Sequence, residues 1–400
     1  MSEWKETTLG ELIDIKHGYA FKGEFFSETP TENVLLTPGN FHIGGGFKGD
    51  KFKYYTGDIP DEYVLSPGDI IVTMTDLSKA GDTLGYSAKI PASRNLFLHN
   101  QRLGLVTIKS SEADINFIYW LLRTHNYQKT VVNSCSGSTV KHTSPSKIKD
   151  YVFLLPPLEE QKSIDAVLSC LDRKIENLRK QNETLEAIAQ TLFKHWFVDF
   201  EFPNADGKPY KSSGGAMEPS ELGDIPAGWR VGKLGDLFNL NYGKSLTLET
   251  RIPGQYAVVG SSGVVGSHQD YLVKAPGIVI GRKGTIGQVI WLEENFYPID
   301  TTFYVEDVLG CSGLYFYYFL LKRQDFQRLT SDSAVPGLNR DMAYSVEVAI
   351  PEISFIDKFN EFSRGIFNKA DLNHREIQTL TQARNVLLPK LMSGKLCITT

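Results

Sequence analysis

The 400-residue chain carries the same ordered set of motifs twice. A W-x4-L-G-x-L pattern comes first, then a Pro-Gly pair with a β-type apolar run, then an aromatic run, and finally a proline before a long helical pattern. Because these matches occur in the same order, the sequence predicts two copies of one unit, each a globular module followed by a long helix. The matching segments are residues 4–12 with 229–237, 67–72 with 276–280, 117–122 with 315–320, and Pro156 with Pro351.

The two modules read as mixed α/β structures with many irregular loops. Short β-type runs such as residues 70–72 and 277–280 are bounded by Pro-Gly and Gly-Gly pairs, which is typical of strands and turns. We expect module 1 at residues 1–155 and module 2 at 229–350. Residues 202–228 hold several Pro, Gly and Ser residues with little periodicity, so we expect a linker there. The helical segments are expected at 156–201 and 351–400.

A long helix is predicted over residues 158–197, because apolar residues recur alternately every four and three positions. Adding 195 (351 − 156) gives a second, weaker seam, interrupted by Ser363, Asn373 and Arg384. Such helices either pair with each other or pack each on its own module. The first seam consists of Ile164, Leu168, Leu171, Ile175, Leu178, Asn182, Leu185, Ala189, Leu192 and Trp196.

Pseudo-two-fold symmetry predicts that the two helices run antiparallel. Centring the seams on each other pairs residues whose numbers add up to 555. Asn182 then meets Asn373, and Leu178 meets Ile377. An amide can both donate to and accept from another amide, so this pair would penalise slips of one heptad. Arg384 faces an apolar position in this register, and we expect its head group to reach solvent or an acidic partner.

Composition indicates a globular chain without a metal framework. Charged residues make up 22%, and 42 basic against 47 acidic residues give a net charge of −5, which counts mildly against nucleic-acid binding unless basic residues cluster locally. The four cysteines are scattered, without a CxxC pair or metal-ligand spacing. No apolar run reaches the length of a membrane span. We therefore expect a cytoplasmic protein without a metal site.

The motif survey argues against catalysis by this chain. Leucines flank Pro156-Pro157, so this pair does not form the polar-Pro-Pro-aromatic loop of an adenine methyltransferase. Gly243-Lys244-Ser245 ends like a phosphate-binding loop, but Phe238 stands where the first glycine is needed. Residues 172–174 mimic the end of a nuclease motif, yet they lie within the heptad helix, where we expect a solvated face.

Three loops carry basic and hydrogen-bonding residues suited to DNA. Residues 137–149 and 274–284 contain no acidic residue, and residues 333–341 are the second-half counterpart of the loop at Ser136. Arginine suits guanine and asparagine suits adenine in the major groove, while lysine and hydroxyl groups suit phosphates. Surface residues without base contact are the alternative. The candidates are Ser138, Thr139, Lys141, His142, Lys274, Arg282, Lys283, Thr285, Ser333, Asn339 and Arg340. For His17, His99 and the aromatic run at 117–122, packing is the better interpretation.

Several segments resemble conserved regions of the specificity (S) subunits of type I restriction–modification systems. The resemblance covers essentially the whole chain, and the long central motif is its most specific part. The matching segments are 155–162 (LPPLEEQK), 171–175 (LDRKI), 182–194 (NETLEAIAQTLFK), 196–200 (WFVDF), 225–229 (IPAGW) and 387–396 (LLPKLMSGKL).

This resemblance implies an α+β architecture of two target-recognition domains, modules 1 and 2, separated by two conserved antiparallel helices. It also implies double-stranded DNA and two kinds of protein partner. Two methyltransferase (M) subunits would hold S-adenosylmethionine, restriction (R) subunits would use ATP, and this chain would hold no cofactor.

The sequence thus favours a non-catalytic subunit that reads a bipartite DNA target, one half-site per module. Two alternatives are a structural scaffold without its own DNA specificity and a fused methyltransferase–nuclease. The missing catalytic motifs and the repeat, which takes up the whole length, argue against the second. A helical seam from Ile164 to Trp196 is roughly 50 Å long, against about 34 Å for one turn of DNA. We therefore expect a fixed, unread spacer between the half-sites.

Overall fold

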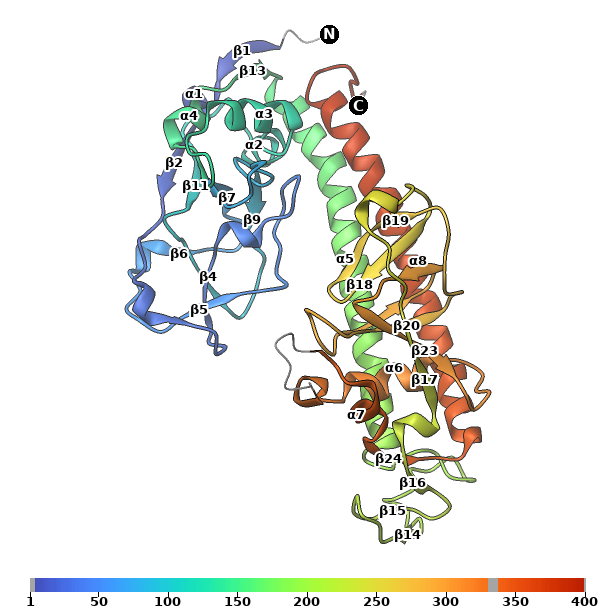
Figure 1. The fold of residues 1–400 in the computed structure, drawn as a ribbon. Helices are drawn as coiled ribbons and strands as arrows, with labels where there is room; N and C mark the ends of the chain where they lie inside the picture. Colours follow the sequence, from blue (N-terminus) through green and yellow to red (C-terminus); the bar gives the residue numbers. More distant parts are fainter. Residues whose placement is uncertain (1–3, 330–336, 399–400) are drawn as a thin grey trace. The chain divides into compact units, whose positions relative to one another are not determined.

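The computed structural model describes residues 4–329 and 337–398 (Figure 1). These residues form two compact units, one within Met1–Glu176 and Ile377–Thr400 and the other within Asn177–Glu376. Two long helices, α5 (Leu158–Phe197) and α8 (Ile353–Leu391), each contribute residues to both units. Each unit therefore consists of one module and one end of each long helix.

Module 1 is built on a four-stranded antiparallel sheet in the order β2-β11-β7-β9. A five-stranded sheet, β3-β5-β4-β10-β6, lies beyond it in the same module. The strands are β1 (Lys5–Thr8), β2 (Ile13–His17), β3 (Phe26–Ser27), β4 (Asn33–Leu35), β5 (Lys53–Tyr55), β6 (Val64–Leu65), β7 (Ile70–Thr73), β8 (Thr75–Asp76), β9 (Ser87–Lys89), β10 (Leu96–Leu98), β11 (Leu103–Ile108), β12 (Lys141–His142) and β13 (Val152–Leu155). The helices are α1 (Leu9–Leu12), α2 (Ile115–Leu121), α3 (His125–Ser134) and α4 (Pro145–Lys149).

Module 2 repeats the four-stranded sheet in the same order, β17-β23-β20-β21, and adds a three-stranded sheet, β19-β18-β22. Its first and last strands, β16 and β24, pair as β1 and β13 do in module 1. The strands are β16 (Arg230–Lys233), β17 (Phe238–Tyr242), β18 (Tyr256–Gly260), β19 (Gly263–His268), β20 (Gly277–Gly281), β21 (Val289–Leu292), β22 (Phe296–Pro298), β23 (Thr302–Asp307) and β24 (Glu347–Ile350), with helices α6 (Tyr315–Lys322) and α7 (Arg340–Tyr344). The sequence repeat is therefore a repeat of topology.

One repeated glycine shows why the motifs recur. Gly18 directly follows β2 in module 1, and Gly243 directly follows β17 in module 2, again 225 positions later (243 − 18). A Cβ atom at Gly18 would collide with the Asn100 carbonyl, and one at Gly243 with the Ile299 carbonyl. Both modules thus bring a second backbone segment against the end of this strand, which only glycine permits.

The aromatic runs form buried helices, as expected. Helix α2 contains Phe117, Ile118 and Trp120, all inaccessible to solvent, and α6 is buried along nearly its whole length. His99 is also buried and its Nε2 lies 3.0 Å from the Leu103 carbonyl. Packing was the wrong interpretation for His17, which is exposed on β2.

The segment predicted as a linker packs against module 2. It contains the short paired strands β14 (Met217–Glu218) and β15 (Ile225–Pro226). The buried ring of Phe202 stacks on Tyr210 and Trp229, with centroid distances of 4.6 and 5.3 Å. Aromatic burial of this kind outweighs the turn-forming composition that suggested a linker.

The long helices run antiparallel in each unit. In the first, Ile164 of α5 and Leu391 of α8 belong to one buried core. In the second, the rings of Trp196 and Phe359 lie 6.1 Å apart, and Asn373 Nδ2 donates a hydrogen bond to Asn182 Oδ1 at 2.8 Å. Leu178 is buried and Ile377 half-buried. The helices also pack on their modules, so the two arrangements left open by the sequence coexist.

Candidate nucleic-acid interface

Arg282 begins the loop that follows β20 in module 2, and its position is fixed by the backbone. Its amide donates to the Thr301 carbonyl at 2.9 Å, and Nη1 donates to the Asp300 carbonyl at 3.2 Å. The guanidinium lies over the Tyr242 ring, 4.9 Å from its centroid. These contacts hold the cation beside a tyrosine that is 46% exposed.

Arg340 lies against the same tyrosine. Its guanidinium is 5.0 Å from the Tyr242 centroid and 6.0 Å from that of Tyr344. Arg340 Nε is buried and has no hydrogen-bond partner in the described part of the chain. Within residues 4–329 and 337–398, neither Arg282 nor Arg340 forms an ion pair with a carboxylate. The site therefore places two guanidinium groups around one exposed aromatic ring, and neither is paired with a carboxylate among the described residues.

The segment that carries Arg340 lies alongside the Arg282 loop. The Leu338 amide donates to the Arg282 carbonyl at 2.9 Å, and Gly337 forms an isolated bridge with Lys283. Lys283 and Thr285 are exposed on the loop. The structure thus brings together four of the predicted residues, Arg282, Lys283, Thr285 and Arg340.

The remaining predicted residues of module 2 lie elsewhere or have other roles. Asn339 caps α7, because its Oδ1 accepts from the amides of Asp341 and Met342 at 2.9 and 3.0 Å. These two hydrogen bonds occupy the amide oxygen and leave only Nδ2 for an adenine, whose recognition by asparagine uses both a donor and an acceptor. Lys274 is exposed and precedes β20, so it lies at the end of that strand opposite to the Arg282 loop. Ser333 lies outside the described residues.

In module 1 the predicted residues form a hairpin. Ser136 and His142 exchange two backbone hydrogen bonds of 2.9 and 2.8 Å, and Ser138 and Thr139 are exposed between them. The hairpin strand β12 pairs with β8, where His142 Nδ1 lies 3.1 Å from Thr75 Oγ1. Lys141 is half-buried and His142 is exposed. All four candidates of this module therefore lie in one substructure.

Sequence reasoning missed the loop that this hairpin accompanies. Residues 77–83 follow the sheet as the Arg282 loop does, and Lys79 is exposed on them. The buried Asp76 holds the loop, since Oδ1 accepts from the Ser78 amide at 2.6 Å and Oδ2 from Thr83 Oγ1 at 2.7 Å. Burial would raise the pKa of Asp76, but these hydrogen bonds prevail and lower it. The sequence repeat already matched the strand at residues 67–72 with the strand at residues 276–280. Extending this match beyond the ends of both strands would have led to residues 77–83 as the counterpart of the Arg282 loop.

Two buried amides attach the modules to the long helices. Gln161 of α5 accepts from the Asp114 amide and donates to the carbonyls of Glu112 and Pro156, each at 2.8 Å. Asn360 of α8 accepts from the Phe316 amide at 3.0 Å and donates to the Gly313 carbonyl at 2.8 Å. Both amides are inaccessible to solvent. Each therefore fixes the start of a buried module helix, α2 or α6.

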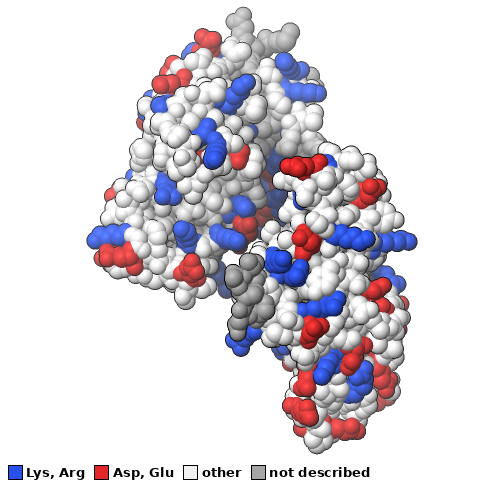
Figure 2. Space-filling view, viewed as in Figure 1, with Lys and Arg blue, Asp and Glu red and all other residues white. Residues whose placement is uncertain are grey.

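Basic and acidic side chains are intermixed on one face of the molecule. In the view of Figure 2, Lys and Arg side chains alternate with Asp and Glu over both modules. Among the described residues, no group of His, Cys, Asp and Glu side chains could hold a metal ion. No helix in that part of the chain is long and apolar enough to cross a membrane.

Comparison with known proteins identifies this architecture of two repeated modules on an antiparallel helix pair. The family model for the type I restriction modification DNA specificity domain matches residues 1–187 and 226–379. The chain therefore belongs to the family of type I specificity subunits.

Individual relatives extend over nearly the full length. The MjaIX specificity subunit of Methanocaldococcus jannaschii is 26% identical, over 88% of this chain and 90% of its own length. The HindI specificity subunit of Haemophilus influenzae is 24% identical, over 99% and 100%. The crystal structure of an S subunit from M. genitalium has the same fold, with a TM-score of 0.58 at 19% identity over 100% of this chain and 97% of that one.

Proposed function

We propose that this chain recognises a bipartite DNA sequence within a type I restriction–modification complex, with one half-site read by each module. Family membership supports DNA sequence recognition as the general function, and specificity subunits are non-catalytic. The observation that supports one half-site per module is the repeated four-stranded sheet. In both modules a loop follows this sheet and lies beside a second segment that carries a basic residue. The scaffold and fused-enzyme alternatives offer no reason for this duplication.

In module 2, Arg282 and Arg340 are the proposed base-reading residues. Bidentate pairing of an arginine with guanine is the commonest specific contact in the major groove. Arg282 is held by the Asp300 carbonyl and the Tyr242 ring, so little side-chain freedom is lost on binding. The exposed Lys283 and Thr285 suit phosphate contacts, which position the protein without reading sequence. Lys274 would contact only the flanking backbone.

In module 1, Lys141, His142, Ser138 and Thr139 are the proposed contacts, joined by Lys79 on the neighbouring loop. Thr75 orients the His142 ring by holding Nδ1, so Nε2 is the nitrogen available to a base or phosphate. Ser138 and Thr139 lie at the tip of a hairpin, where short hydroxyls can bond to either group.

We further propose that the helix pair sets the distance between the half-sites. Helix α5 has 40 residues, which corresponds to about 60 Å at 1.5 Å per residue. This length exceeds the roughly 34 Å of one DNA turn, so the two modules can contact one face of the duplex with an unread spacer between them.

The proposed partners are two M subunits, which would hold S-adenosylmethionine, and R subunits, which would use ATP, all in the cytoplasm. Ile188 of α5 and Phe362 of α8 are 47% and 52% exposed and line one apolar groove with Ala187 and Leu192. Exposed apolar side chains grouped on a helix surface favour a protein partner. We infer that an M subunit binds here.

The test is DNA binding and methylation with purified components. The host target would first be defined by methylome sequencing, and binding would then be measured at a stated salt concentration with and without M subunit. We expect sequence-specific binding when M is present and methyl transfer only by the complex. Loss of specificity in every arm would favour the scaffold, and methylation by the isolated chain would favour the fused enzyme.

A further inference from the structure

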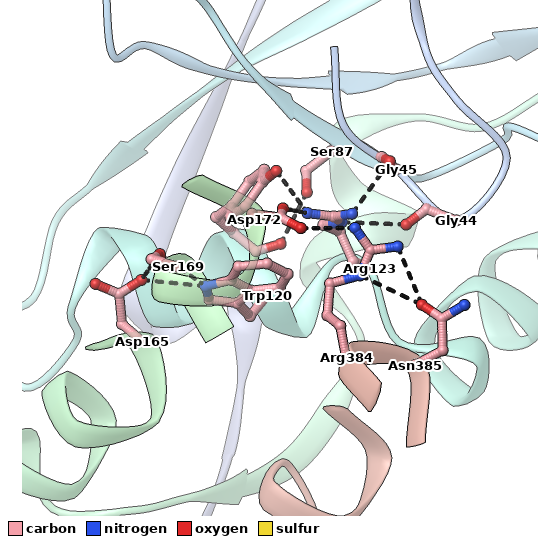
Figure 3. A network of polar contacts seen from close by, with 11 residues as sticks. Gly44, Gly45, Ser87, Trp120, Arg123, Asp165, Ser169, Asp172, Arg384 and Asn385 are labelled. Atoms are coloured by element: carbon pink, nitrogen blue, oxygen red, sulfur yellow. Dashed lines mark hydrogen bonds and ion pairs between the residues drawn. The ribbon is translucent and has the colours of Figure 1, made fainter. Parts of the chain in front are cut away.

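An ion network inside the first unit joins α5, α8 and module 1 (Figure 3). Asp172 of α5 accepts from Arg123 Nη1 at 2.7 Å and from Arg384 Nη1 at 2.6 Å. Arg123 lies just after α2 in module 1, and Arg384 belongs to α8. The expectation of a solvated face at residues 172–174 is therefore wrong for Asp172, whose side chain is 26% exposed, although Arg173 and Lys174 are exposed.

Arg123 is also fixed from the module side. Its side chain is only 3% exposed, Nε donates to the Gly44 carbonyl at 3.1 Å, and Nη2 donates to the Gly45 carbonyl at 3.3 Å. The guanidinium lies 4.6 Å from the Trp120 centroid. Gly45 has φ of +84°, and a Cβ there would meet Arg123 Cγ at 2.7 Å. One arginine thus connects a glycine loop of the module to the helix pair.

The two arginines keep the Asp172 carboxyl charged although it is largely buried. Burial would raise the pKa of Asp172, but Arg123 and Arg384 outweigh it and lower that pKa. A buried ion pair adds little net stability over apolar residues of similar size, because desolvation offsets the attraction. The hydrogen bonds within such an ion pair are directional, however, so they are satisfied in only one arrangement of the side chains. Apolar packing, in contrast, tolerates small displacements of the packed elements.

The second unit shows that the fold does not require charges at these positions. The repeat offset of 195 places Phe367 at the position of Asp172 and Ala189 at that of Arg384, and the aromatic-run offset of 198 (315 − 117) places Leu321 at that of Arg123. Ala189 and Leu321 are buried, and Phe367 packs on Trp291 at 5.0 Å. These three positions are therefore apolar in the second unit and ionic in the first, and the second unit's own ion pair between module and helix, Lys322 with Glu186 at 2.6 Å, lies at other positions.

We infer that Asp172, with Arg123 and Arg384, is a positioning residue that fixes module 1 on the helix pair and so restricts the spacer length that the complex accepts. This inference rests on the proposed function. Asp172 contacts neither DNA nor a reacting group, and acts through the module that Arg123 anchors. Without the network, only apolar contacts would hold module 1 on the two long helices, and the module could shift along them. Targets with one base pair more or less in the spacer would then become acceptable.

The test replaces the network with apolar residues of similar size, Arg123→Met, Asp172→Leu and Arg384→Met together. The control, Lys162→Met, breaks an exposed ion pair with Glu159 on the same helix. Complexes of each chain with M subunit would methylate targets whose spacers differ by one base pair from the native length. The wild type and the control should prefer the native spacer. In the triple variant this preference should fall about tenfold, equivalent to about 1.4 kcal/mol.

Two results would overturn the inference and are distinguishable. If the wild type methylates a bipartite target and the folded triple variant keeps its spacer preference, the positioning role alone is wrong. If the wild type has no bipartite target, the proposed function fails and the inference with it. Should the triple variant not fold, hydrogen exchange in Asp172→Asn decides. Amides of residues 42–46 should exchange about tenfold faster than in the wild type, while those of residues 117–122 exchange at the wild-type rate. If the substitution changed the exchange of both segments by the same factor, or of neither, the positioning role would be contradicted.

Discussion

Gln161→Leu should destabilise the first unit alone. The substitution keeps the side-chain size but removes three hydrogen bonds of 2.8 Å, to the Asp114 amide and the carbonyls of Glu112 and Pro156. The Pro156 carbonyl would stay buried and unpaired, which costs about 1–3 kcal/mol, and each of the two part-buried bonds contributes about 1 kcal/mol. Greater apolar burial of leucine returns part of this loss. We therefore expect a net loss of about 3 kcal/mol.

Hydrogen exchange measured by mass spectrometry can assign this loss to one unit. A change of about 3 kcal/mol corresponds to roughly a hundredfold faster exchange in the most protected amides of α2, with α6 in the second unit unaffected. Asn360→Leu should produce the reverse pattern, because its bonds hold α6. Gln190→Leu, at an exposed position of the same helix, is the control. Protection of α2 in Gln161→Leu that stays within a factor of two of wild type would refute the reasoning.

Three further predictions concern single sites. Arg282→Ala should relax one position of the second half-site at a cost of about 1–3 kcal/mol if the arginine reads a base; uniform weakening in a target-library binding assay would mean a phosphate contact instead. A double-mutant cycle of Asn182→Ala and Asn373→Ala, followed by urea denaturation, should give a coupling free energy of about 1 kcal/mol for their 2.8 Å bond, and zero coupling would contradict it. Burial lowers the pKa of His99 to about 4; because the unfolded chain takes up this proton first, stability is full above about pH 6.5 and should fall by up to about 3 kcal/mol as the pH drops towards 4. His99→Gln should flatten this pH dependence, and an unchanged slope would be inconsistent with it.

The sequence predicted the helices and the repeat because both rest on local periodicity. Heptad spacing depends only on which residues are apolar, so both seams could be identified. The Asn182–Asn373 contact followed from matching their centres. The loops of the candidate interface were predicted in part, since charge and turn residues mark loops but do not show which loops meet. Residues 77–83 were missed for this reason.

The junctions between helices and modules could not be predicted in the same way. Arg123, Asp172 and Arg384 are far apart in the chain, and their contact depends on the packing of α2 against both long helices. On a helix, Asp172 beside Arg173 and Lys174 has the composition of a solvated surface. Gln161 and Asn360 differ in residue type, and they are not separated by the 195 positions that relate the two helical seams. Their equivalent roles therefore appear only in the hydrogen bonds.

The central claim is that each module reads its own half of the target, and a module exchange tests it most directly. Residues 11–150 would be replaced by the corresponding module of another family member, and the methylome of a host that expresses the hybrid with its M subunit would be sequenced. We predict that one half of the methylated sequence changes while the other half and the spacer stay the same. A hybrid whose target changed in both halves, or in neither, would contradict the account.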